Sequence, residues 1–138
     1  MPGPASWLAL LAATTLGSAS LTEVQVTAGG VRAQSPMRLV VQTYAPENVD
    51  ALGRVSPRAR PLGSMQRAVS AEELARGVPV SVLQLDGERD AHVVVAWVEP
   101  GEPNLELDAR TAKPAAEALV GVSHSRAGER AHIVMRSA

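Results

Sequence analysis

The sequence of 138 residues contains no cysteine. A chain without cysteine cannot form a disulfide framework, a cysteine-based zinc site, a thiol nucleophile or a lipid-modified cysteine anchor. Phenylalanine is absent too, and the aromatic residues are only Trp7, Tyr44 and Trp97. Valine, leucine and alanine must therefore fill the core. Valine favours strands, because its β-branched side chain is stiff and packs well on a pleated surface.

The chain also lacks an excess of charge, since its formal net charge is −1 from 13 basic and 14 acidic residues. Nucleic-acid binding needs a strong basic excess to displace phosphate counterions, so no nucleic-acid partner is predicted. The charges are uneven, with four arginines and no acid over Arg54–Arg67, and seven acids and one arginine over Asp86–Asp108. Solvated loops explain this pattern. The alternative is a dipolar domain whose acidic end meets a basic partner or another copy of itself, head to tail.

The apolar run Trp7–Leu16 is ten residues long, whereas a membrane-spanning helix needs about 20. Small residues follow it at 17–20, and this pattern predicts a signal peptide over residues 1–20, cleaved after Ala19 or Ser20. The mature chain, 21–138, is then a single domain in the periplasm or outside the cell. No lysine or arginine precedes the run, which departs from the usual signal. The alternative is a buried N-terminal helix or strand of a cytosolic domain.

Apolar and polar residues alternate in short segments separated by turn residues, which predicts a mainly all-β fold. The pattern favours an immunoglobulin-like antiparallel β-sandwich of about seven short strands. The predicted strands cover residues 22–26, 37–43, 62–69, 78–85, 93–98, 118–122 and 131–135. Both alternating sets of 93–98 are apolar, so this strand is predicted to be central, with Trp97 buried. The last two segments are predicted to form a closing hairpin, and residues 49–61 a loop.

One short helix is predicted near residues 70–77. Ser70 and Glu73 form a capping box, in which each side chain bonds the backbone N–H of the other residue. Gly77 is placed to end the helix in a left-handed conformation. The helix joins two strands and has a structural role.

The three histidines are His92, His124 and His132. In a closing hairpin, His124 and His132 could face each other and bind zinc or copper with a carboxylate such as Glu129. This spacing is not a recognised ligand pattern, and solvated histidines are the other interpretation. Ser123 and His124 are adjacent on a strand and point to opposite faces, so they do not form a nucleophile–base pair. No nucleophile elbow or phosphate-binding glycine motif occurs. We therefore predict no enzyme activity, no metal and no cofactor.

The segment Glu99–Pro114 (EPGEPNLELDARTAKP) leaves the predicted central strand through two prolines and carries four acids. Loops of this length inside a compact domain are often functional. We predict a protruding loop or short edge strand that contacts a partner, and a plain connection is the alternative. The predicted contact residues are Glu99, Glu102, Leu105, Glu106, Leu107 and Asp108.

These observations predict an exported, non-enzymatic binding or assembly module. It would contact another protein through a sheet edge or through the 99–114 loop. One alternative is a small exported hydrolase or metal-binding protein that uses His92, His124 and His132. Another is a structural subunit of a surface or particle assembly, in which copies of the chain associate with one another.

Overall fold

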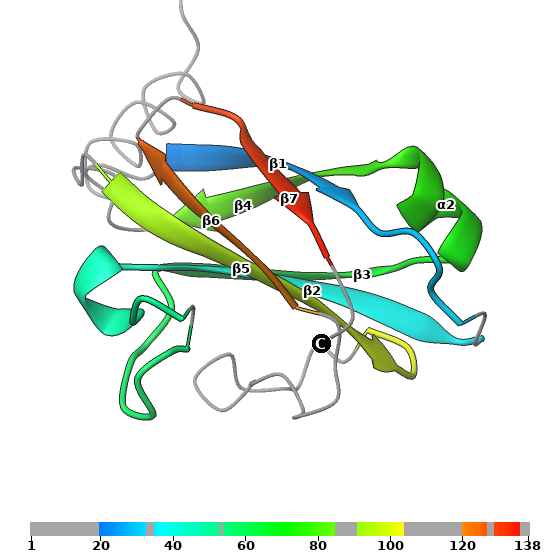
Figure 1. Cartoon of the computed structure of the whole chain (residues 1–138), viewed down its shortest axis with the longest axis horizontal. Helices are drawn as coiled ribbons and strands as arrows, with labels where there is room; N and C mark the ends of the chain where they lie inside the picture. The colour runs from blue at the N-terminus through cyan, green and yellow to red at the C-terminus, as the bar shows by residue number, and fades with distance from the viewer. Residues whose placement is uncertain are drawn as a thin grey trace, which may run out of the picture.

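The computed structural model describes residues 20–32, 35–52, 54–84, 91–103, 120–126 and 129–135. The regular structure of this part of the chain consists mostly of strands (Figure 1). The strands are β1 (Ser20–Thr27), β2 (Met37–Tyr44), β3 (Gly63–Ala68), β4 (Val78–Gln84), β5 (Ala91–Pro100), β6 (Val120–Arg126) and β7 (Ala131–Val134). A 3-10 turn, η1 (Pro46–Asn48), follows β2, and a six-residue helix, α2 (Ala71–Arg76), joins β3 to β4. No described helix is long and apolar enough to cross a membrane.

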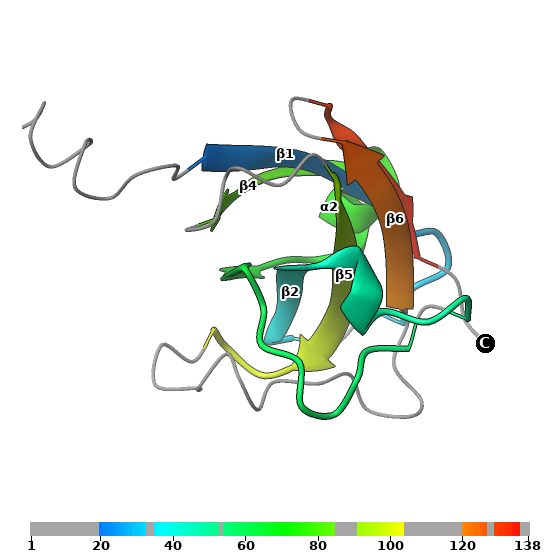
Figure 2. The same cartoon turned by 90° about the vertical axis from the view of Figure 1, so that its left-hand side faces the viewer.

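The strands form two sheets packed face to face (Figure 2). The three-stranded sheet has the order β4-β1-β7, and the four-stranded sheet has the order β3-β2-β5-β6. The predicted all-β sandwich of about seven strands is confirmed. The immunoglobulin-like order is not confirmed, because strands 1 and 2 share a sheet in an immunoglobulin domain, whereas β1 and β2 lie in different sheets here. The β1–β7 pair is also parallel rather than antiparallel.

The main core lies between the sheets and is aliphatic. Alternate residues of β1 and β4 point inward, as in Val24, Val26 and Val80, whereas Glu23, the residue before Val24, is exposed. From the opposite sheet, Leu39 of β2 and further residues of β5 complete the layer. This alternation places one apolar face of each sheet against the other, because successive side chains on a strand point to opposite sides.

A second apolar cluster lies on the outer face of the four-stranded sheet. It contains Val40 and Tyr44 of β2 and Val93, Val95 and Trp97 of β5. Part of the chain after β2 packs against it through Val49 and Ala59. The inner strands β2 and β5 are therefore buried on both faces, and Trp97 is 0% exposed as predicted.

Two glycines allow the edges of the sheets to approach each other closely. A Cβ atom on Gly63 of β3 would lie 2.3 Å from the Leu83 carbonyl oxygen of β4. A Cβ atom on Gly121 of β6 would lie 2.2 Å from Ile133 Cγ2 of β7. Any larger residue at these two positions would push the sheets apart, so the glycines set how tightly the sandwich closes.

Helix α2 forms where the sequence predicts it. The Ser70 hydroxyl accepts a hydrogen bond from the Glu73 N–H at 3.1 Å, and the Glu73 carboxylate accepts one from the Ser70 N–H at 3.1 Å. Leu74 is fully buried and its carbonyl accepts from the Ala28 N–H, which fixes the helix to the end of β1. Gly77 has φ 102° and ψ 130°, so it ends the helix with a positive φ but outside the left-handed helical region. The chain passes from there directly into β4.

The predicted closing hairpin is wrong. β6 pairs with β5 in the four-stranded sheet, whereas β7 crosses to the other sheet and pairs with β1. A hairpin would have left one side of β1 without a strand neighbour and the core residue Val24 uncovered. In the observed arrangement Ala131 lies beside Val24 and Ile133 beside Val26, and all four side chains are buried.

Candidate protein-contact groove

The three histidines lie in three separate places. His92 of β5 is buried on the inner face of the four-stranded sheet, opposite Ser125. His124 of β6 is exposed and lies opposite Val93, on the outer face of that sheet. His132 of β7 is exposed on the outer face of the three-stranded sheet. The common metal or catalytic site considered for these residues is therefore not formed, and no group of three potential metal-ligating residues occurs within the described ranges.

The interior at the end where β5 begins is polar rather than aliphatic. His92 is 4% exposed, and its Nε2 atom has no hydrogen-bond partner among the described residues. The same is true of Thr43 Oγ1 on the neighbouring strand β2. From the facing sheet, Gln84 donates a hydrogen bond to Thr22. Burial lowers the pKa of His92, because the charged imidazolium loses hydration there.

Glu99 lies inside β5 and not in the loop that the two prolines predict. β5 continues to Pro100, with Glu99 opposite Arg38 and Pro100 opposite Met37 of β2. The Glu99 carboxylate accepts from Trp97 Nε1 at 2.7 Å and from Arg38 Nη2 at 2.5 Å. The backbone pairing with β2 continues the strand past Glu99, and the Glu99 carboxylate is already paired with Arg38 and Trp97. Residues 105–108 lie outside the described residues.

A groove opens where the chain leaves β5, with a volume of about 340 Å³. Three segments meet there: the entry to β2, the turn from β3 into α2, and the exit from β5. Its lining residues are Ser35, Pro36, Met37, Ala68, Val69, Ser70, Glu73, Glu102 and Pro103. Backbone bonds from Val69 N–H to the Met37 carbonyl (3.1 Å) and from Gly101 N–H to the Pro36 carbonyl (2.9 Å) hold the segments together. The Ser35–Pro36 peptide bond is cis.

The groove has an apolar floor and an acidic rim. Met37 and Val69 are buried beneath it, at 4% and 7% exposed. Among the described lining residues, Glu73 and Glu102 are the charged ones, and both are negative. The Glu73 carboxylate forms an ion pair with Arg67 at 2.8 Å. The Glu102 carboxylate has no partner among the described residues, while Arg38 Nη1 binds the Glu102 carbonyl at 2.9 Å and fixes the backbone.

Sequence reasoning missed a second surface, at the opposite end of β2. We name residues 49–60, of which 53 is not described, the Leu52 loop. Leu52 is 77% exposed, the highest value among the exposed large apolar residues. Asp50 Oδ1 accepts from the N–H groups of Leu52 and Arg54, each at 2.9 Å, and Oδ2 accepts from Arg54 Nε at 3.1 Å. The pKa of Asp50 is lowered mainly by the hydrogen bond from the Arg54 N–H. The Leu52 N–H and the Arg54 guanidinium lower it further. The loop is thus a hydrogen-bonded turn that presents one leucine.

Another exposed apolar pair lies on the outer face of the three-stranded sheet. Leu21 of β1 and Leu83 of β4 are cross-strand partners and are 64% and 54% exposed. Their nearest neighbours along that face include the Glu23 carboxylate, which accepts from the Ser81 hydroxyl at 3.0 Å. This pair is distant in sequence from the groove and provides a matched comparison for exposed leucines.

The described residues form an all-β sandwich with a groove at one end. No family model and no curated protein matches the sequence. A solved structure of an alternative pilotin from the type II secretion system of Vibrio cholerae is similar in fold, with a TM-score of 0.51 and 8% sequence identity. The superposition covers 87% of this chain and 97% of the pilotin. The likeness extends over nearly the whole of both chains and supports the sandwich fold.

Proposed function

We propose that this chain is an exported, non-enzymatic protein-binding domain. The groove between the entry to β2, the start of α2 and the exit from β5 carries the proposal. Its apolar floor suits an aliphatic side chain, and its acidic rim suits an arginine or lysine beside that side chain. Glu102 lines the groove, and the sequence-predicted contact residues Leu105–Asp108, which lie outside the described residues, remain part of the proposal. The similar fold of a pilotin from a type II secretion system supports a role in protein contacts during secretion.

Export is part of the proposal. The apolar run Trp7–Leu16 and the small residues after it support a cleaved signal, which places the mature domain in the periplasm or outside the cell. The mature chain should begin at Ser20 or Leu21. The intact mass of protein recovered from a periplasmic or culture fraction measures this directly. Full-length protein that retains Met1 in the cytosol would contradict it.

Binding at the groove can be measured with a synthetic peptide in which one leucine is flanked by arginines. Amide resonances of Met37, Val69 and Glu102 should shift on titration of the isotope-labelled chain. Glu102→Arg should weaken binding by about tenfold or more, because it places a positive charge opposite the peptide's arginines. High salt should also weaken binding, because the charges at the rim are exposed.

The matched control is Glu72→Arg. Glu72 is an exposed acid in the first turn of α2, one residue from Glu73, but it does not line the groove. Glu72→Arg makes the same change in net charge as Glu102→Arg, and its affinity for the peptide should stay within about twofold of the wild type. If both variants lose the same amount of affinity, or if amide resonances shift over the whole surface, the peptide is bound by general charge attraction. Either result would contradict a binding site at the groove.

A further inference from the structure

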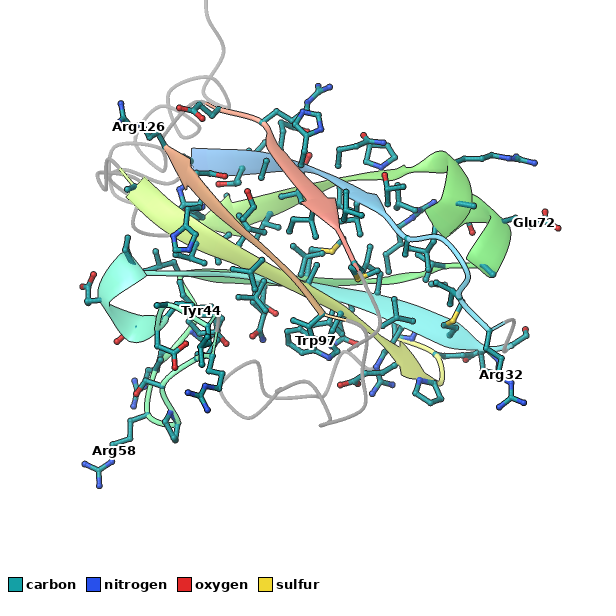
Figure 3. All side chains as sticks on the ribbon, in the orientation of Figure 1. Arg32, Tyr44, Arg58, Glu72, Trp97 and Arg126 are labelled. Carbon is teal, nitrogen blue, oxygen red and sulfur yellow. The ribbon has the colours of Figure 1, made fainter. Side chains whose placement is uncertain are left out.

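The groove and the Leu52 loop lie at opposite ends of the sandwich. Met37, the first residue of β2, lines the groove, whereas the Leu52 loop follows the last residue of the same strand. Eight residues of extended chain separate the two surfaces by roughly 25 Å. In Figure 3, Arg58 of the loop projects at one end and Glu72, beside the groove, projects at the other. One molecule cannot bring its own loop to its own groove.

The Leu52 loop is a preformed apolar projection. Its tip is fixed by the Asp50 carboxylate, and its base by the Val49–Val55 bridge and by the bond from Ser56 N–H to the Asn48 carbonyl at 2.8 Å. A projection that is ordered before binding loses little conformational entropy when it is bound. Leu52 is nevertheless 77% exposed, so the free chain gains no burial from this residue.

The charges of the two surfaces are opposite. Arg58 and Arg60 are exposed in the same loop as Leu52, whereas Asp50 is already paired with Arg54. At the groove, Glu73 is likewise paired with Arg67, so the negative charge that is not balanced above the apolar floor is the Glu102 carboxylate, which has no partner among the described residues. Arg32 also lies at the groove end (Figure 3) but does not line the groove. A loop that carries the exposed Leu52 and two exposed arginines therefore complements an apolar floor beside the Glu102 carboxylate.

We infer that the groove binds the Leu52 loop of a second copy of this chain. The inference rests on the proposed function, because it takes the groove as a contact site and names its occupant. Each molecule has one groove and one loop at opposite ends, so the contact is heterologous and leaves a free groove and a free loop at the two ends of any dimer. Repetition of the contact builds a linear head-to-tail chain rather than a closed dimer. Two grooves or two loops do not pair with each other, because each would bring like charges together.

The average mass of the wild-type chain, measured by sedimentation velocity or light scattering, should rise continuously with protein concentration. Leu52→Asp removes the projection and Glu102→Arg reverses the rim charge, and each should weaken association about tenfold or more. An equimolar mixture of the two variants should form a 1:1 dimer and nothing larger. In that mixture the intact loop of the Glu102→Arg chain binds the intact groove of the Leu52→Asp chain, and both remaining surfaces are inactive.

Leu83→Asp is the control for loss of an exposed leucine, and it should associate as the wild type does. Equal loss of association in Leu83→Asp, or a mixture of the two contact variants that stays monomeric, would overturn the inference. If the wild type is monomeric at all concentrations while the arginine–leucine peptide still binds the groove, the head-to-tail contact is wrong and the proposed function stands. If neither the peptide nor a second copy binds, the groove is not a contact site, and both ideas fail.

Discussion

Replacing Trp97 with alanine should lower the free energy of unfolding by about 3–5 kcal/mol, the usual cost of removing a buried tryptophan. Trp97 is fully buried and packs with the valines of β2 and β5 in the outer cluster. Its Nε1 atom donates to Glu99 at 2.7 Å, so the substitution also removes one partner of a half-buried carboxylate. Urea denaturation followed by far-ultraviolet circular dichroism measures the change.

Trp97→Phe separates the contribution of aromatic packing from that of the Nε1 hydrogen bond. It keeps most of the aromatic volume and loses the N–H donor, so it should cost clearly less than the alanine substitution. Glu99 retains Arg38 in both variants. A loss below about 1 kcal/mol for Trp97→Ala would contradict the placement of this side chain in a packed cluster.

The strands could be predicted from the sequence because each has its own alternation. Val24 and Val26 of β1, and Val80 and Val82 of β4, repeat at every second position and are separated by polar residues. The doubly apolar segment around Val93–Val98 likewise predicts an inner strand, since both of its faces must be covered. Local patterns of this kind report which residues point inward, and the structure buries those residues.

The pairing of the strands could not be predicted in the same way. Alternation in β6 and β7 is equally compatible with a hairpin and with strands in different sheets. What decides between them is the covering of Val24 and Val26 by Ala131 and Ile133, more than 100 residues later in the chain. The close approach of Gly121 to Ile133 depends on the same long-range arrangement. Neither feature has a local sequence signal.

The candidate site was predicted only in part. Glu102 was identified from its acidic, proline-rich surroundings, and it does line a groove. Glu99 was assigned to the same loop because prolines usually end a strand, but its bonds to Arg38 and Trp97 keep it in β5. The floor residues Met37 and Val69 come from segments far apart in the sequence. Leu52 is a single apolar residue in a polar loop, and its exposure depends on the turn made by Asp50.

Acid should destabilise this domain through His92. The pKa of His92 is lowered from 6.5 in the folded chain, because the imidazole is buried. The unfolded chain therefore takes up the proton first, and stability falls as the pH drops below about 6.5. The fall continues until the lowered pKa of the folded state is reached, with a limiting slope of about 1.4 kcal/mol per pH unit from this residue. Among the described residues, the polar side chains at this end of the interior, Thr43, Ser125 and the Gln84–Thr22 pair, carry no charge that could stabilise the imidazolium.

His92→Gln keeps a polar side chain that does not titrate, so its unfolding free energy should change less between pH 7 and pH 5 than that of the wild type. His132→Gln is the matched control, because His132 is an exposed histidine on the other sheet. Its pH dependence should follow the wild type. Urea denaturation series at half-unit steps of pH provide the comparison. Parallel curves for the wild type and His92→Gln over this range would mean that the buried imidazole is not the group that makes the fold sensitive to acid.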